Sequence, residues 1–213
     1  MKTKVKISAI LILISLVLVY FLHTNEFNSV KTIAIQPLGN ISNEEPILKL
    51  KNDIEIFYNK KVVILPSIPL SSNYIDVNKG IRYDAERIIR ELSSQKSEVY
   101  GRVIGYTEED IFMYRSVTKK SEFETMELLD AWGIFGLGNK PGKACVVSTY
   151  RLQDKSESLM YKRLEIVALH ELGHTFGLNH CDEKGCIMKG NYLNVNEIEE
   201  STGAFCSKCN AKK

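Results

Sequence analysis

The sequence predicts a mixed α/β sheet backed by helices on one side. Strand-like apolar runs alternate with amphipathic stretches along residues 31–152, which is the pattern of a sheet covered by helices. After residue 24 no repeat or low-complexity linker divides the chain, and its 213 residues are 44% hydrophobic, enough for one core. We therefore expect residues 25–213 to form one domain behind an amino-terminal segment, residues 1–24.

The first half of the domain supplies two strands and two helices. We expect a strand over residues 31–38 (KTIAIQPL), a helix over 44–58 with acidic residues and a proline at its start, and a short buried strand over 61–66. A second helix is marked by an apolar stripe that needs a sheet to cover: Ile81, Ala85, Ile88, Ile89 and Leu92.

The second half adds two strands and a longer helix. A strand is expected over 99–107, with Thr107 and Asp110 placed as a capping box for the next turn. The glycine-rich stretch 132–143 reads as a loop with one apolar hairpin or bulge, and 144–152 (ACVVSTYRL) is the clearest β-branched strand. A strong helix over 159–178 follows, with apolar residues along its inner side.

The amino-terminal segment has the layout of a targeting sequence. An uncharged apolar run, Ile7–Leu22, follows Lys2, Lys4 and Lys6. As a helix it would span about 24 Å, short of a hydrocarbon core of about 30 Å, which suits a cleaved signal peptide. The following HTNEFNSV has no small-residue cleavage signal, however, which favours an uncleaved transmembrane helix. We expect a membrane-anchored protein with an extracytoplasmic catalytic domain, the alternative being secretion after cleavage.

The charge balance excludes one class of partner. The formal net charge is +2, and without the three lysines ahead of the apolar run it is −1. A nucleic-acid-binding protein would show a basic patch on its folded part, and none is visible. We expect no nucleic-acid partner.

The window HELGHTFGLNHC, residues 170–181, holds three of the four histidines of the chain. His170 and His174 are four residues apart, so both imidazoles project from one helix face, and Glu171 lies about 100° around the helix. His180 can join them only if the helix ends, and Gly177 stands where a left-handed residue would end it. Three histidine ligands leave the fourth position of a tetrahedral zinc open, as in catalytic sites. The alternative is that these histidines make only structural hydrogen bonds.

The last 33 residues hold four of the five cysteines. Cys181 and Cys186 form one spaced pair, and Cys206 and Cys209 form a CxxC. Two such pairs are typical of a closed, structural four-cysteine zinc site, with two disulfides as the alternative. Cys145 is left over and is expected to be a buried, unpaired thiol.

These motifs together resemble the archaemetzincins, a family of metzincin-type metallopeptidases. The family pattern HExxHxxGxxHC, then four residues, CxM, a gap of seventeen residues and CxxC, is matched at every fixed position from His170 to Cys209. The resemblance implies a metzincin-like fold: a twisted, mostly parallel mixed sheet with an antiparallel edge strand, an active-site helix and a small zinc-stapled C-terminal subdomain.

The resemblance also implies residue roles. His170, His174 and His180 would bind a catalytic zinc, Glu171 would be the general base, and Met188 would be the Met-turn residue beneath the metal. The four C-terminal cysteines would bind a second, structural zinc, giving two zinc ions per chain. Tyr192, shortly after Met188, is a candidate donor to the developing oxyanion.

The expected function is that of a zinc metallopeptidase. A zinc-activated water would attack the peptide bond with Glu171 as base, and the strand 144–152 could bind the backbone of a peptide or protein substrate as a sheet edge. One alternative is a catalytically silent, zinc-stapled binding or regulatory domain, and another is a hydrolase of non-peptide amides or esters. The membrane, reached through the amino-terminal segment, is the other expected partner.

Overall fold

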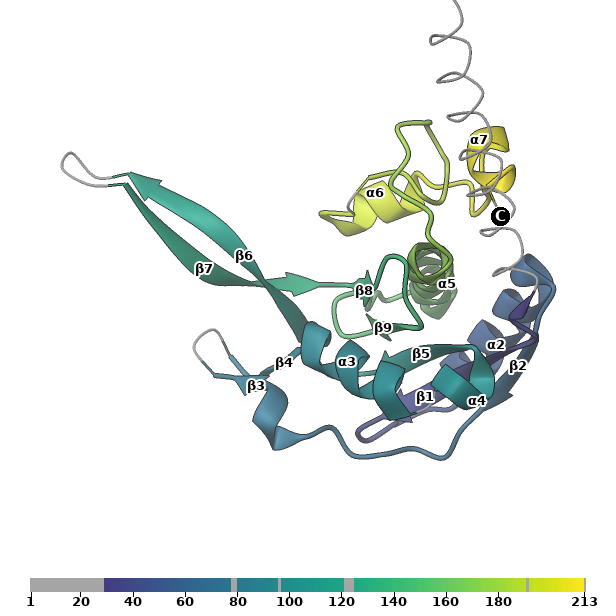
Figure 1. Ribbon diagram of the computed structural model, residues 1–213, viewed down its shortest axis with the longest axis horizontal. Coiled ribbons are helices and arrows are strands. Elements are labelled where there is room, and N and C mark those ends of the chain that lie inside the picture. The colour runs from purple at the N-terminus through teal and green to yellow at the C-terminus, as the bar shows by residue number, and fades with distance from the viewer. Residues whose placement is uncertain (1–28, 78–79, 96, 121–124, 191, 213) are drawn as a thin grey trace, which may run out of the picture.

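The computed structural model describes residues 29–77, 80–95, 97–120, 125–190 and 192–212 (Figure 1). The main sheet has the strand order β2-β1-β5-β9-β8. Its members are β1 (Thr32–Leu38), β2 (Lys61–Ile64), β5 (Arg102–Thr107), β9 (Ala144–Ser148) and β8 (Gly136–Gly138).

The direction of the strands confirms the predicted sheet. β2, β1, β5 and β9 run parallel, and β8 pairs antiparallel with β9 at one edge. The prediction that 144–152 forms the substrate-facing edge was wrong, because β9 lies inside the sheet between β5 and β8. The edge strand beside it is β8, from the glycine-rich stretch.

Helices cover both faces of this sheet, which corrects the prediction of a single covered side. Helices α2 (Glu45–Tyr58) and α5 (Glu157–Thr175) share one core with Ile33 and Ile35 of β1. Helix α3 (Ala85–Gln95) packs with Ala34 on the opposite face. Burial on both faces explains why the parallel strands are continuously apolar rather than alternating.

Several predicted boundaries shift for local reasons. α3 begins at Ala85 rather than at Ile81, because the Asp84 carboxylate accepts hydrogen bonds from the N–H groups of Glu86 and Arg87 at its start. Ile81 is 69% exposed and lies outside the helix. The capping box at Thr107 formed only in part: the Thr107 Oγ1 accepts from the Glu109 N–H at 3.1 Å, but the Asp110 carboxylate pairs with Arg151 and the chain continues into a strand.

A second sheet, absent from the sequence prediction, has the order β3-β4-β6-β7. The long strands β6 (Ile111–Lys120) and β7 (Thr125–Ile134) pair antiparallel and project from the body as a two-stranded ribbon (Figure 1). The smaller neighbours of this ribbon are β3 (Ile75–Asp76), β4 (Arg82–Asp84) and η1 (Ser72–Tyr74), whereas the short helix α4 (Ser97–Tyr100) lies against β1 and β5 of the main sheet. The base of the ribbon leads directly into edge strand β8.

The C-terminal segment packs against the long helix α5. Its short helices are α6 (Val195–Glu199) and α7 (Ser207–Asn210). Arg163 of α5 is buried and donates to Glu199 of α6 at 2.6 Å and to Asp154 at 3.1 Å. Ile187, Met188 and Ile198 share the core of α2 and α5, so this subdomain is continuous with the main domain.

The membrane prediction requires a correction. Across the described part of the chain, from residue 29 onward, every helix is too short or too polar to cross a bilayer. The apolar run at residues 7–22 lies outside the described residues, as does the predicted boundary at residue 24. The predictions of a transmembrane helix and of a membrane-anchored, extracytoplasmic location were therefore wrong for the described residues, and no described helix supports a membrane partner.

Candidate metal centres

Helix α5 carries the first part of the histidine motif and then ends where the sequence predicts. His170, Glu171 and His174 are all buried on its last two turns. The helix stops at Thr175, and Gly177 takes φ 87°, a left-handed conformation that favours glycine. The N–H of Gly177 donates to the carbonyl of His174 at 2.8 Å. The chain therefore turns back and brings the exposed His180 beside the other two imidazoles.

The three histidines converge through their Nε2 atoms. The His174 Nε2 lies 3.0 Å from that of His170 and 3.1 Å from that of His180. The Nδ1 of His170 donates to the carbonyl of Ile187 at 2.7 Å, and the Nδ1 of His174 donates to that of Leu178 at 2.8 Å. Since Nδ1 carries the proton in both rings, both Nε2 atoms present lone pairs.

This arrangement fits a metal ion better than mutual hydrogen bonding. Two lone pairs at 3.0 Å cannot bond each other, whereas nitrogens around a tetrahedral zinc lie about 3.3 Å apart. Burial lowers the pKa of His170 to about 3 and that of His174 to about 4, and it also lowers the pKa of His180. The imidazoles are thus neutral at physiological pH, which is the ligand form.

Glu171 lies beside the three imidazoles without joining their cluster. Burial raises the pKa of its carboxyl to about 8, while a hydrogen bond from the backbone N–H of Gly138 lowers it. Edge strand β8 approaches closely enough for this bond because it lacks side chains there. A Cβ on Gly136 would lie 2.8 Å from the Glu171 Cγ, and one on Gly138 would lie 2.5 Å from its carbonyl oxygen.

A cavity of about 400 Å³ opens in front of these groups. Its walls come from α5, from β8, from the base of the β6–β7 ribbon and from the segment after α5. This cavity is also lined by Met113, Arg115 and Lys140, which were not predicted as site residues from the sequence. Only the density of glycines in 132–143 signalled a close approach of the backbone there.

Met188 lies fully buried beneath the histidines. Its position requires a glycine on α5, since a Cβ on Gly173 would lie 2.6 Å from the Met188 Sδ. Tyr192 packs beside His170, with ring centroids 5.0 Å apart, and its hydroxyl donates to the carbonyl of Ile187 at 2.9 Å. The same carbonyl accepts the bond from His170, so Tyr192 and His170 are held at one shared acceptor.

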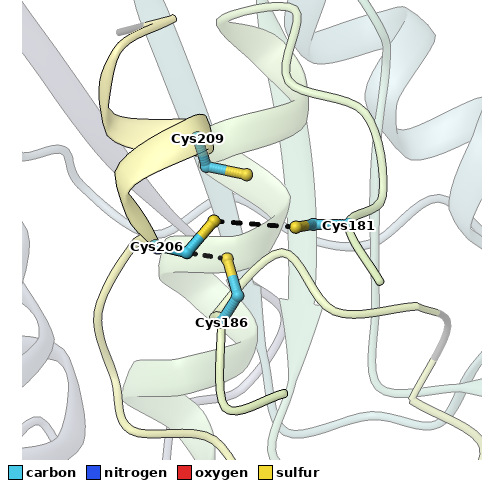
Figure 2. Close-up of side chains that lie close together, drawn as sticks. All are labelled: Cys181, Cys186, Cys206 and Cys209. Atoms are coloured by element: carbon cyan, nitrogen blue, oxygen red, sulfur yellow. Dashed lines mark hydrogen bonds between the residues drawn. The ribbon is translucent and has the colours of Figure 1, made fainter. Parts of the chain in front are cut away.

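The four C-terminal cysteines form a second cluster (Figure 2). Their side chains point toward one another, and their sulfur atoms all lie within 4.8 Å. The Sγ atoms of Cys181 and Cys206 are 3.7 Å apart, close to the about 3.8 Å of sulfurs around a tetrahedral zinc. All four cysteines are free thiols, which disfavours the disulfide alternative.

Backbone amides support the thiolate form of this cluster. The N–H of Cys206 points at the Cys186 Sγ at 3.4 Å, as Figure 2 shows, and the N–H of Glu183 points at the Cys181 Sγ at the same distance. A bond from the Cys209 backbone N–H lowers the pKa of Cys206 to about 7, whereas burial raises the pKa of Cys186 and of Cys209. Cys145 lies apart from the cluster as a buried free thiol, as predicted, and burial raises its pKa.

Comparison with known proteins identifies the family. A family model described as "Peptidase family M54" matches residues 29–213. The chain belongs to peptidase family M54. This is a family of zinc metallopeptidases, so the predicted archaemetzincin resemblance and the predicted enzyme class, a hydrolase acting on peptides, are both confirmed.

Two archaeal relatives show how far the similarity extends. This M54 chain is 27% identical over 180 residues to the archaemetzincin of Archaeoglobus fulgidus, covering 84% of this chain and 97% of that protein. It is 33% identical over 128 residues to the archaemetzincin of Methanopyrus kandleri, covering 60% of this chain and 63% of that protein.

Solved structures confirm the M54 fold. The archaemetzincin of A. fulgidus, crystallised in complex with malonate, has a TM-score of 0.69 at 26% identity, over 85% of this chain and 99% of that one. A zinc-dependent peptidase from Methanocorpusculum labreanum has a TM-score of 0.64 at 20% identity, over 84% of this chain and 98% of that one. The second likeness concerns the fold alone.

Proposed function

We propose that this M54 chain hydrolyses peptide bonds, with zinc held by His170, His174 and His180 and with Glu171 as general base. The observation that carries the proposal is the convergence of three imidazole nitrogens, 3.0 and 3.1 Å apart, beside a buried carboxyl in an open cavity. Three donors leave one position of a tetrahedral ion free for chemistry.

The chain's own groups supply proton transfer and orientation. A zinc ion bound there would polarise the scissile carbonyl and acidify a neighbouring water. Beside a bound zinc cation the pKa of the Glu171 carboxyl would be lowered from about 8, so the carboxylate form accepts the proton of the attacking water and returns it to the leaving amine, and the products are a carboxylic acid and an amine. The Gly138 N–H holds the Glu171 carboxylate in place, and the carbonyls of Ile187 and Leu178 hold the rings of His170 and His174.

Edge strand β8 is the proposed platform for the substrate backbone. Among the described strands it pairs with β9 alone, so its outer edge is open beside the histidines, apart from the Gly138 N–H that donates to Glu171. An extended peptide would add to this edge as a further strand.

The four cysteines are proposed to hold a second, structural zinc. Their sulfur separations and N–H···S contacts suit a closed four-thiolate site with no position left for a substrate. This gives two zinc ions per chain. The same proposal includes Met188 as packing beneath the histidines and residues 25–213 as one metallopeptidase domain.

The variant Glu171→Gln tests the function. We expect it to keep two zinc ions per chain but to lose about 10²- to 10⁴-fold in peptide turnover, the usual contribution of a general base. Glu165→Gln on the same helix is the matched control, because Glu165 faces Asp53 and Lys49 rather than the cavity. Unchanged turnover in Glu171→Gln would contradict the mechanism. Absence of peptide turnover in the zinc-loaded wild type would favour a silent binding domain, or an ester or non-peptide amide hydrolase if those substrates react.

A further inference from the structure

Two basic side chains line the walls of the catalytic cavity and are not used by the proposed mechanism. Arg115 comes from the base of the β6–β7 ribbon, and Lys140 comes from the loop after edge strand β8. The two side chains thus come from segments at the two ends of β8. The β6–β7 ribbon that carries Arg115 leads through β7 into the start of β8, and Lys140 lies two residues after Gly138, the last residue of β8.

Arg115 is positioned by its neighbours on the ribbon. Met113 and Arg115 are two residues apart on β6, so both side chains lie on the face that borders the cavity. Trp132 of β7 pairs with Met113 in register, and the Arg115 guanidinium lies over the Trp132 ring, 5.6 Å from its centroid. This cation–π contact holds the guanidinium and leaves its N–H donors available to a ligand.

Lys140 is placed beside the histidines by its loop. The N–H of Gly142 donates to the carbonyl of Thr175 at 3.2 Å, which ties the loop to the end of α5 next to His174. The Lys140 residue is exposed and lines the cavity with His174 and His180. Among the described residues no ion pair within 4.0 Å involves Lys140 or Arg115, so both charges are available in the cleft.

The charge balance of the cavity is positive. Glu171 is the one carboxyl among the described lining residues, and it is buried and bonded to the Gly138 N–H. Asp130 lies opposite Arg115 in the ladder but is not part of the lining. A concave site with one sign of charge concentrates ligands of the opposite sign.

We propose that Arg115 and Lys140 are specificity-determining residues that select peptides carrying a carboxylate close to the scissile bond. The inference rests on the proposed peptidase function and names its substrate class. The carboxylate can be an acidic side chain or a free C-terminus. Arg115 would bind the carboxylate on the side where β8 begins, through two N–H donors of its planar guanidinium. Lys140 would bind a carboxylate on the side where β8 ends, through its ammonium charge.

Matched fluorogenic peptides test this selection with the zinc-loaded full chain. Pairs differing only by Glu or Gln at each position near the cleaved bond separate the side-chain source, and pairs with a free or amidated C-terminus separate the terminal source. We expect kcat/KM to favour the carboxylate member of at least one series about tenfold, mainly through KM, which is the value of one charge-assisted contact. Arg115→Gln and Lys140→Gln should each reduce the preference, on opposite sides of the bond.

The control variant is Arg90→Gln, an equal loss of charge on the exposed side of α3, across the sheet from the cavity. It should retain the wild-type preference. Arg115→Glu should go further than Arg115→Gln and favour peptides with lysine in place of glutamate. Equal kcat/KM for every carboxylate and neutral pair in the wild type would overturn the proposal, as would an unchanged preference in both glutamine variants.

Binding to zinc-loaded Glu171→Gln separates this inference from the proposed function. If no peptide is hydrolysed by the wild type, the proposed function fails, but fluorescence anisotropy still compares the same peptide pairs. Tighter binding of the carboxylate member, weakened by Arg115→Gln or Lys140→Gln in that background, would support the selection. Equal affinities within every pair would overturn it.

Discussion

The histidine and cysteine clusters meet at the bond between His180 and Cys181, yet the chain builds them in different ways. Two of the three histidines lie on one buried helix, and only His180 comes from a turn. The cysteines instead come from the loops after α5 and from the short helix α7 with the residue before it. The histidine cluster opens on a cavity of about 400 Å³, whereas the four sulfurs face one another.

The packed fold therefore positions the histidines, whereas the cysteine cluster itself holds the loops that carry it. The packing of helix α5 positions the imidazoles of His170 and His174 without the help of a metal ion. Loops have little structure of their own to fix four thiols, so metal binding and folding should be coupled there. Three donors leave an ion reactive, and four donors close it.

Short backbone contacts connect the two clusters. The N–H of Cys181 donates to the carbonyl of Met188 at 2.7 Å, and the N–H of Ile187 donates to that of Ala204 at 2.9 Å. The carbonyl of Ile187 in turn receives the His170 ring. The segment that the cysteines hold therefore orients a histidine of the other site.

Replacing both Cys206 and Cys209 with serine should have the largest effect, because it tests whether metal binding and folding are coupled at the cysteine cluster. We expect loss of one zinc per chain, destabilisation by at least about 3 kcal/mol, and weaker zinc binding at the histidines because Ile187 and Met188 lose their anchor. Metal analysis and thermal unfolding measure these effects. Cys145→Ala is the control, since Cys145 lies apart from both clusters. A double serine variant that still holds two zinc ions would contradict the assignment.

The clustering of the three histidines was predictable from the sequence because the spacing of the first two is set by helix geometry. Residues four apart lie on one face of a helix, as His170 and His174 do, and a glycine such as Gly177 is typical of a helix C-terminus. The parallel strands were also predictable, since β1, β5 and β9 are continuous apolar runs.

The walls of the cavity were not predictable from local pattern. The β6–β7 ribbon carries Arg115 into the cavity from a position 55 residues before His170 in the chain, and no spacing rule links them. The edge strand β8 was read as a loop because Gly136 and Gly138 weaken any strand pattern. Those glycines are present because a Cβ would collide with α5, which is a tertiary reason.

Gly173→Ala tests the packing of Met188 against α5 while leaving all three histidines unchanged. The added Cβ would lie 2.6 Å from the Met188 Sδ, so Met188 must move or α5 must shift. We expect a loss of about 1–3 kcal/mol in the free energy of unfolding and weaker zinc binding at the histidines, with the cysteine site retained. Denaturant unfolding and zinc titration measure both. A Met188→Ala background should relieve most of the clash, and equal costs of Gly173→Ala in both backgrounds would argue against it.

Tyr192→Phe gives the smallest expected effect and decides between two roles. The hydroxyl donates to the Ile187 carbonyl, which also receives His170, so its loss should cost about 0.5–1.5 kcal/mol and lower zinc affinity at the histidines a few fold. If Tyr192 instead turns toward the substrate and stabilises the oxyanion, kcat should fall about 10²- to 10³-fold with zinc affinity unchanged. Measuring kcat at saturating zinc together with zinc affinity separates the two. A large loss of kcat alone would show that the tyrosine leaves its supporting position when a substrate binds.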